Sequence, residues 1–347
     1  EDIRECIGCN ICVSGDMTYS RIRCTQNPTM GEEWRKGWHP ERIAKSVSQD
    51  SVLIVGGGPA GLECARALGQ RGYAVTLAEA GDALGGRILN ESRLPGMASY
   101  QRVVEHRLAA FNKLPNVETY LASDLSAEQV IAFEARHIVL ATGAAWRRDG
   151  VGCSRRTALP IAASVPAIFT PDDIFAGKIP GDGPVLVYDD ERYIMAGLIA
   201  EKLARDGHAV TLMTPETMVS PWSENTLEQH AIQRRILEAG VTIMTARRLV
   251  ALENGARHAC IYTGQEAEIE AAAVVLVTSR LPNDSLWLDL QARAENALAP
   301  WQSLTRIGDA LAPATVAHAI YAGHRYAREF DTQACEGAPY MRERVTV

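Results

Sequence analysis

The stretch Ser51–Gly61 reads SVLIVGGGPAG, and it decides the fold of the chain. Its first part, Val52–Val55, is a short apolar run of the kind that forms a buried parallel strand. The glycines Gly56, Gly58 and Gly61 follow at once with the spacing G-x-G-x-x-G. An Ala-rich stretch comes next and predicts a helix. Strand, glycine turn and helix in this order predict the first unit of a dinucleotide-binding fold.

Each residue of the turn has a physical task. Gly56 permits a tight turn, Gly58 lets a pyrophosphate approach the backbone, and Gly61 allows close packing of the helix on the strand. The helix predicted over Leu62–Gln70 would direct its N-terminus at the phosphates, and Pro59 and Ala60 lie in the turn just before it. We therefore expect these five residues to line a site for an adenine dinucleotide or its ADP half.

A second predicted strand, Tyr73–Leu77, ends just before Glu79. An acid at this position accepts hydrogen bonds from an adenosine ribose hydroxyl. The alternative is a surface residue that only caps a loop. Two further turns rich in small residues are expected to pass near the cofactor, and they contain Gly86 with Arg87 and Thr142 with Gly143.

Four of the eight cysteines lie within the first 24 residues. Cys6, Cys9, Cys12 and Cys24 have the spacing C-x2-C-x2-C-x11-C. A tight triplet of thiolates, closed by a fourth from a separate loop, is typical of an iron-sulfur cluster. Zinc is the main competing interpretation, but structural zinc sites usually take their ligands as two separated pairs. The spacing therefore predicts a single [4Fe-4S] cluster.

A second copy of the nucleotide fold is predicted further along the chain. Val185–Tyr188 resembles the first strand, and Ala209–Leu212 repeats Ala74–Leu77 letter for letter. However, the turn between them begins with Asp189–Glu191, where a phosphate-binding copy has glycines, and Thr214 replaces the ribose-binding acid. Carboxylates at this place would repel a pyrophosphate. We expect a scaffold that no longer binds NAD(P)H.

Composition excludes several classes of protein. The chain has 347 residues, is 47% hydrophobic and carries a formal net charge of -7, which argues against a disordered chain and against a nucleic-acid binder. No run approaches the roughly 18 apolar residues of a membrane span. Disulfides are not expected in a large acidic chain, so a reduced, cytoplasmic setting is predicted. The opening at Glu1 indicates a part of a longer protein.

The predicted fold class is α/β, with an N-terminal iron-sulfur loop segment followed by two nested Rossmann-like domains of the FAD/NAD(P)-reductase type. The expected bounds are 1–50 for the cluster segment, 51–165 with 295–347 for a split FAD- or ADP-binding domain, and 166–294 for an inserted, degenerate NAD(P)-type domain. The segment 295–347, in which the chain returns to the first nucleotide-binding domain, contains Asp309. This residue resembles the aspartate that approaches the flavin's ribityl-phosphate in flavoprotein reductases. A plain helix N-cap is the alternative.

These features together resemble the trimethylamine and dimethylamine dehydrogenase branch of the NADH:flavin oxidoreductase family, which is related to old yellow enzyme. The resemblance covers essentially the whole chain, includes N-methylproline demethylase-like proteins, and is most specific from Arg4–Cys12 through Cys24–Asn27 to Gly37–Pro40. Family members carry an upstream FMN barrel, which we expect to lie outside this sequence. Trp34, Trp38 and His39 would pack beside the cluster.

The resemblance implies electron transfer from the FMN barrel through the cluster to an electron-transfer flavoprotein-like acceptor, in an oligomer. The substrate-oxidising site would then lie outside this chain, and we nominate no catalytic residue within it. Two alternatives stay open: an NAD(P)H-dependent FAD/[4Fe-4S] reductase of the 2,4-dienoyl-CoA reductase type, and a non-catalytic nucleotide-binding assembly subunit. The absent glycines of the second copy favour the amine dehydrogenase.

Overall fold

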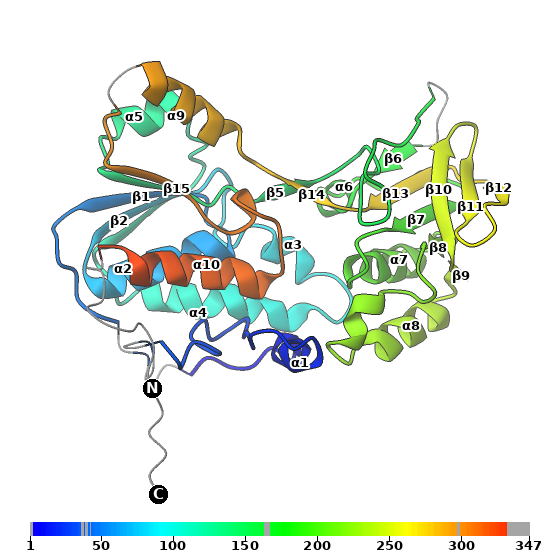
Figure 1. The fold of residues 1–347 in the computed structure, drawn as a ribbon, viewed down its shortest axis with the longest axis horizontal. Helices are drawn as coiled ribbons and strands as arrows, with labels where there is room; N and C mark the ends of the chain where they lie inside the picture. The colour runs from blue at the N-terminus through cyan, green and yellow to red at the C-terminus, as the bar shows by residue number, and fades with distance from the viewer. Residues whose placement is uncertain are drawn as a thin grey trace, which may run out of the picture. The chain divides into compact units, whose positions relative to one another are not determined.

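Two five-stranded sheets form the frame of the protein, one in each of its two units, and the strands within each sheet are parallel (Figure 1). The computed structural model describes residues 3–35, 38, 41, 43–162, 167–296 and 299–331. The first unit contains the chain up to Ser92, Ser99–Ala144 and the chain from Pro282 onward; the second contains Arg93–Ala98 and Ala145–Leu281. The predicted α/β fold class, with two Rossmann-like folds, is confirmed.

The sheet of the first unit has the strand order β15-β4-β1-β2-β3, and all neighbours are parallel. Its strands are β1 (Ser51–Val55), β2 (Ala74–Ala78), β3 (Val117–Tyr120), β4 (His137–Leu140) and β15 (Ser303–Arg306). The chain winds from β1 toward β3 and then returns to β4 on the other side of β1. In such sheets, ligands bind outside the carboxyl ends of the strands where the order reverses. That point lies between β1 and β4.

Helices cover both faces of this sheet (Figure 1). On one face lie α5 (Ala127–Ala132) and α9 (Ser285–Asn296), which share an apolar core with β1 and β4. On the other lie α2 (Pro59–Arg71), α4 (Gln101–Phe111) and α10 (Val316–Glu329). The shorter elements of this part of the chain are α1 (Ile11–Met17), α3 (Ile88–Glu91), η1 (Ala98–Tyr100) and η3 (Gly308–Ala310).

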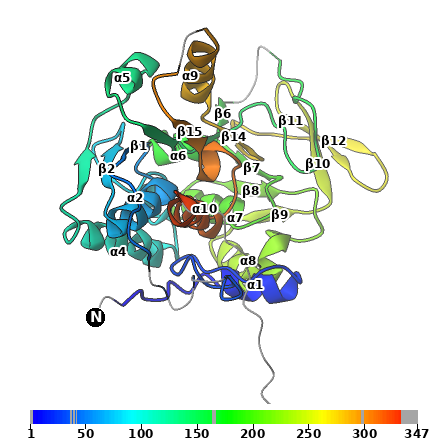
Figure 2. The same cartoon turned by 60° about the vertical axis from the view of Figure 1, so that its left-hand side comes forward.

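The backbones of α2 and α10 approach each other closely at Gly323, and Figure 2 shows the two helices side by side. A Cβ on Gly323 would lie 2.2 Å from the carbonyl oxygen of Ala60 and 3.0 Å from the amide nitrogen of Cys64. A Cβ on Gly308 would lie 2.7 Å from the Cβ of Ala60. Two glycines late in the chain therefore allow the first turn of α2 to sit where it does.

A buried carboxylate joins α2, α4 and α10. Glu63 of α2 pairs with Arg66 at 2.6 Å, with Arg107 of α4 at 2.9 Å and with Nδ1 of His324 on α10 at 2.8 Å. We call these four buried residues the Glu63 network. Burial alone would raise the pKa of Glu63, but the two guanidinium groups outweigh it and hold that pKa well below its usual range. An ionised carboxylate therefore ties three helices together.

The second unit repeats the same strand order, β6-β13-β7-β8-β9, again in parallel. An antiparallel sheet of β10, β11 and β12 packs on it through a shared apolar core. Strands β5 and β14 pair with each other where the chain passes between units. The elements are β5 (Ala144–Trp146), β6 (Ala167–Phe169), α6 (Pro171–Phe175), β7 (Val185–Asp189), α7 (Met195–Arg205), β8 (Val210–Met213), η2 (Pro221–Glu224), α8 (Gln229–Glu238), β9 (Thr242–Met244), β10 (Arg247–Leu252), β11 (Ala256–Cys260), β12 (Glu266–Ile269), β13 (Ala273–Val277) and β14 (Arg280–Pro282).

The turn after β7 is closed by its own acidic residues. The Oδ1 atom of Asp189, which is fully buried, accepts hydrogen bonds from the backbone N–H groups of Glu191 at 3.2 Å and Arg192 at 2.9 Å. The carboxylate of Asp190 is also buried and accepts from the N–H of Ser154 at 2.9 Å. Burial raises the pKa of Asp189 to about 7. This turn bonds to itself and to its own unit.

In the part of the chain that the structure describes, no helix combines the length and the apolar character needed to cross a bilayer.

We predict that Gly323→Ala destabilises the protein by about 1–3 kcal/mol, because the added methyl group cannot fit against α2. Urea denaturation at neutral pH measures the effect. The matched control is Gly181→Ala, where a Cβ meets no atom within 4 Å. Equal stability of the two variants would contradict the close helix contact.

We also predict that Asp189 makes stability depend on pH. Its pKa is about 7 when folded and returns to the ordinary 3.8 on unfolding, so the folded state binds the proton more tightly. This contribution is fully present below about pH 4 and is lost as the pH rises through about 7. Asp189→Asn should therefore gain stability relative to the wild type between pH 4 and pH 8 in denaturant titrations. The stability-versus-pH curve of the exposed-site control Asp182→Asn should run parallel to that of the wild type. If the Asp189→Asn curve also runs parallel, the raised pKa of Asp189 is refuted.

Candidate functional site

The four N-terminal cysteines lie in α1 and in the loops on either side of it. Cys6 and Cys9 precede this helix, Cys12 lies in its first turn and Cys24 lies in the loop that follows. Burial raises the pKa of the Cys9 thiol, the hydroxyl of Thr25 opposes the rise, and the nearby thiols of Cys24 and Cys12 add to it. Cys12 and Cys24 therefore each lie within electrostatic range of Cys9.

Hydrogen-bond donors point at the sulfur atoms of this segment. The backbone N–H of Gly8 lies 3.4 Å from the Sγ of Cys6, and the N–H of Gln26 lies 3.4 Å from the Sγ of Cys24. Gly8 has a φ of 71°, a left-handed conformation that reverses the chain between the first two cysteines. Hydrogen bonds to sulfur stabilise thiolates and help to set the reduction potential of iron-sulfur clusters. These donors fit the chemistry of a cluster.

No three His, Cys, Asp or Glu side chains among the described residues converge as the ligands of a single metal ion do. A [4Fe-4S] cluster needs no such convergence, because each cysteine thiolate binds its own iron corner. Cys9 is buried, Cys12 and Cys24 are partly exposed, and Cys6 is exposed. The chemistry of the four cysteine donors fits a cluster near the surface, because each thiol loses its proton when it binds iron.

Side chains outside the motif hold the first cysteine loop in place. The hydroxyl of Ser99 donates to the carbonyl oxygen of Ile7 at 2.8 Å, and Arg102 of α4 donates to that of Cys6 at 3.2 Å. Sequence reasoning missed Ser99 and Arg102, because more than 90 residues separate each from its partner and neither belongs to a motif. The packing of η1 and α4 brings them to the cysteines.

The aromatic residues after the cysteines have different environments. Trp38 is buried; its ring lies 4.0 Å from the guanidinium carbon of Arg35 and packs edge-on against His324 of α10, with ring centroids 5.7 Å apart. Trp34 is partly exposed and has the guanidinium of Arg21 at 4.9 Å from its ring. His39 lies outside the described residues.

The glycine turn of the first unit has the geometry that its spacing predicts. A Cβ on Gly56 would lie 2.4 Å from the carbonyl oxygen of Ala141, and one on Gly61 would lie 1.9 Å from that of Gly56. By contrast, a Cβ on Gly58 would meet no atom within 4 Å, so open space lies beside it. Gly58 is the N-cap of α2, and Pro59 and Ala60 begin its first turn. Packing requires two of the glycines, and the third leaves room for a ligand.

Glu79 directly follows β2 and faces this turn. Its Oε2 accepts a hydrogen bond from the N–H of Gly57 at 2.6 Å, and its Oε1 accepts one from the N–H of Gly81 at 2.8 Å. A carboxylate has about four acceptor positions, so it retains capacity for ribose hydroxyls. Gly86 lies against the turn as well, because a Cβ on it would be 2.9 Å from the Cα of Gly58.

The remaining predicted residues surround the ends of β4 and β15. The guanidinium of Arg87 donates to the carbonyl oxygen of Ala144 at 2.6 Å, and the hydroxyl of Thr142 donates to that of Asn283 at 2.6 Å. Gly143 has a φ of 73°, and a Cβ there would meet no atom within 4 Å. Asp309 in η3 accepts a hydrogen bond from the N–H of Ala314 at 3.0 Å. Arg87 and Thr142 thus bond to backbone carbonyls, and Asp309 accepts from a backbone N–H.

The turn after β7 in the second unit carries side chains where the first unit has glycines. A Cβ on Gly152 would lie 2.4 Å from the Oδ2 of Asp190, so the carboxylate of this turn packs against the segment between β5 and β6. Arg192 has a φ of 75° and pairs with Glu216 at 2.9 Å. Thr214, at the place of the ribose-binding acid, is buried and accepts from the N–H of Glu216 at 3.2 Å. These groups of the turn after β7 and of the segment after β8 thus have partners within the second unit.

Two family models match the chain. Pyridine nucleotide-disulphide oxidoreductase matches residues 50–160, and the OYE-like second alpha/beta domain matches residues 169–267. Dimethylamine dehydrogenase from Hyphomicrobium sp. (strain x) is 35% identical over 99% of this chain and 50% of its own length. A probable N-methylproline demethylase from Rhizobium meliloti (strain 1021) is 28% identical over 92% of this chain and 49% of its own length.

Among solved structures, histamine dehydrogenase from Rhizobium sp. 4-9 matches with a TM-score of 0.93 and 48% sequence identity, over 100% of this chain and 54% of that chain. The chain therefore spans about half the length of the relatives it matches. It belongs, over that half, to the trimethylamine and dimethylamine dehydrogenase branch of the old yellow enzyme-like flavin oxidoreductases.

Proposed function

We propose that this chain is the iron-sulfur and adenine-nucleotide-binding electron-transfer part of an FMN-dependent amine or N-methyl amino-acid dehydrogenase. The observation that carries the proposal is the four-cysteine segment, in which the sulfurs of Cys6 and Cys24 receive backbone hydrogen bonds and the loop of Cys6 is anchored on α4. Electrons would enter from an FMN barrel and leave singly for an electron-transfer flavoprotein-like acceptor. The proposed setting is a cytoplasmic oligomer.

In this proposal the residues of the cysteine segment bind the cluster and set its reduction potential. Cys6, Cys9, Cys12 and Cys24 would hold a [4Fe-4S] cluster, which supplies one-electron transfer when bound. The N–H groups of Gly8 and Gln26 would stabilise negative charge on sulfur. Exposure of Cys6 supports electron exchange with a partner at the surface.

The edge of the first unit would hold FAD or ADP. Gly58 leaves room for the pyrophosphate beside the N-terminus of α2, and Glu79 would accept hydrogen bonds from the ribose. The turn closed by Asp189 and Asp190 argues against a hydride donor in the second unit. A flavin in the first unit would then lack a source of electron pairs, so ADP is favoured.

Two other functions make different predictions for bound ligands. An NAD(P)H-dependent reductase of the dienoyl-CoA type needs a nicotinamide site in the second unit and FAD in the first. A non-catalytic assembly subunit needs the nucleotide but no cluster. Ligand content and ligand binding therefore separate the three functions.

We predict that the anaerobically purified protein contains iron and acid-labile sulfide, and that Cys24→Ala loses most of both, because three thiolates no longer close the cluster. Chemical analysis and the broad visible absorbance of the cluster measure this. The control is Cys260→Ala on β11 of the second unit, which should match the wild type. Wild-type protein without iron, or equal iron in both variants, would contradict the cluster assignment.

We further predict that Gly58→Ala weakens binding of ADP about tenfold or more, roughly 1.4 kcal/mol, because its methyl group enters the space for the pyrophosphate. The variant should keep wild-type stability, since that Cβ meets no protein atom within 4 Å. Calorimetry with ADP and with NADPH measures both ligands, and Gly181→Ala is again the control. Tight NADPH binding that Gly58→Ala leaves unchanged would instead favour the reductase.

A further inference from the structure

A buried arginine on α4 connects the cysteine segment with the Glu63 network. Arg107 has no exposed surface. Its Nε donates to the Oε2 of Glu63 at 2.9 Å, and its Nη1 donates to the Oε1 of Gln26 at 3.3 Å and to the carbonyl oxygen of Val103 at 2.8 Å. One guanidinium therefore reaches from α2 to the loop that carries Cys24.

Gln26 in turn bridges the two loops that carry the first and fourth cysteines. Its Nε2 donates to the carbonyl oxygen of Glu5, directly before Cys6, at 3.1 Å. Its backbone N–H is the donor that lies 3.4 Å from the Sγ of Cys24. The side chain is buried, and its acceptor oxygen is the atom that Arg107 holds. The position of this amide depends on the guanidinium behind it.

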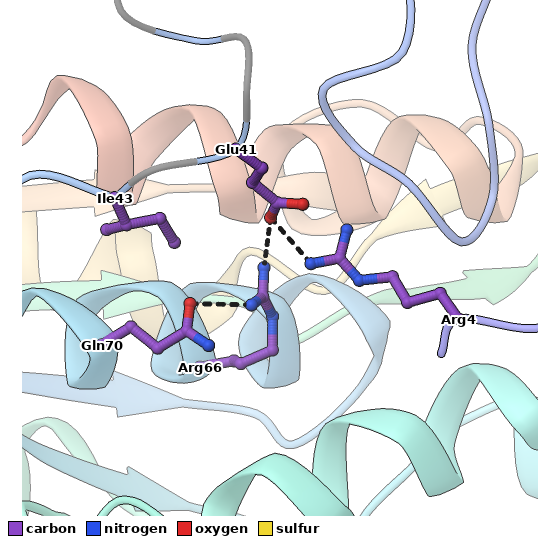
Figure 3. Close-up of a pocket in the computed structure, with 5 residues that line it drawn as sticks. All are labelled: Arg4, Glu41, Ile43, Arg66 and Gln70. Carbon is purple, nitrogen blue, oxygen red and sulfur yellow. Dashed lines mark hydrogen bonds and ion pairs between the residues drawn. The ribbon is translucent and has the colours of Figure 1, made fainter. Parts of the chain in front are cut away.

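The network around Arg107 carries more positive than negative charge. Glu63 faces both Arg66 and Arg107, and Glu41 is shared between Arg66 at 3.3 Å and Arg4 at 2.7 Å. Figure 3 shows Glu41 between these two guanidiniums in a pocket of about 310 Å³. These contacts thus join three positively charged guanidinium groups to only two carboxylates.

The protonation states preserve this excess at neutral pH. Burial lowers the pKa of Arg107 to about 10, which still leaves it protonated. Burial also lowers the pKa of His324, although the neighbouring Glu63 opposes the shift, so the imidazole is mainly neutral. The Nη2 of Arg107 has no hydrogen-bond partner among the described residues. A buried positive charge therefore lies behind the cysteine loops without full compensation in the network.

We infer that Arg107 is a positioning residue for the cluster: it fixes Gln26 between the two cysteine loops and holds a buried positive charge that raises the cluster's reduction potential. The inference rests on the proposed function, because it requires a cluster at the four cysteines. Its physical basis is that net charge and hydrogen bonds to sulfur set the potentials of such clusters. A purely structural arginine would affect stability and leave the potential unchanged.

Three variants separate these roles. Gln26→Leu removes the bridge between the two cysteine loops and leaves the Arg107–Glu63 pair intact. This variant therefore keeps the test possible if the Arg107 variants fail to fold. Arg107→Met removes the charge, and Arg107→Lys keeps the charge but loses the planar fork that binds two acceptors at once. The control is Arg71→Met, an equally buried arginine whose hydrogen bonds go to carbonyl oxygens, including those of Ala44 and Ala327.

The readouts are the cluster midpoint potential, from a redox titration followed by electron paramagnetic resonance, and the rate of iron loss to a chelator. We expect lower potentials in Gln26→Leu and Arg107→Met, a smaller fall in Arg107→Lys, and faster iron loss in all three. Arg71→Met should keep the wild-type potential. Wild-type potentials and iron-loss rates in Gln26→Leu and Arg107→Met, or an equal shift in Arg71→Met, would overturn the inference. Wild-type protein that contains no cluster would overturn the proposed function as well.

Discussion

The first unit depends on one buried carboxylate. Glu63 accepts hydrogen bonds from two arginines and a histidine on three helices, and it has almost no exposed surface. An unpaired charge at this depth costs several kcal/mol, so each partner is needed to keep the others in place. The same carboxylate orients Arg107, which holds the loop of the fourth cysteine. The nucleotide-binding helix α2 and the cysteine segment therefore share one electrostatic support.

The two units share one fold but differ in the turn that follows the first strand of the sheet. Both have the same parallel strand order, yet the turn after the first strand is open in one and closed in the other. In the first unit Gly58 leaves space at the N-terminus of α2; in the second, the carboxylate of Asp190 packs against Gly152 and Asp189 is desolvated. A buried carboxylate with a raised pKa is costly, and it does not favour an anionic ligand. This contrast supports a scaffold role for the second unit.

Local signals in the sequence predicted most of the frame. The glycine turn predicted β1 and α2, although α2 begins at Pro59, earlier than the apolar pattern alone indicates, because Gly58 and Pro59 suit the N-cap and first position. In the second unit α7 begins only at Met195, because Asp189 accepts a hydrogen bond from the backbone N–H of Arg192, which has a positive φ. The resemblance to the amine dehydrogenase branch is confirmed.

The Glu63 network lay beyond local signals. Its members are separated by 44 residues between Glu63 and Arg107 and by 261 between Glu63 and His324, and charged residues on helices usually face solvent. The contacts of Ser99 and Arg102 with the cysteine loop have the same origin in tertiary packing.

An anaerobic reductive titration followed by electron paramagnetic resonance tests most directly whether this chain holds a one-electron [4Fe-4S] cluster. We expect dithionite to introduce one electron per chain, with a [4Fe-4S]-type signal, and NADPH to introduce none; reduction by NADPH, or no cluster signal with either reductant, would contradict the proposed function.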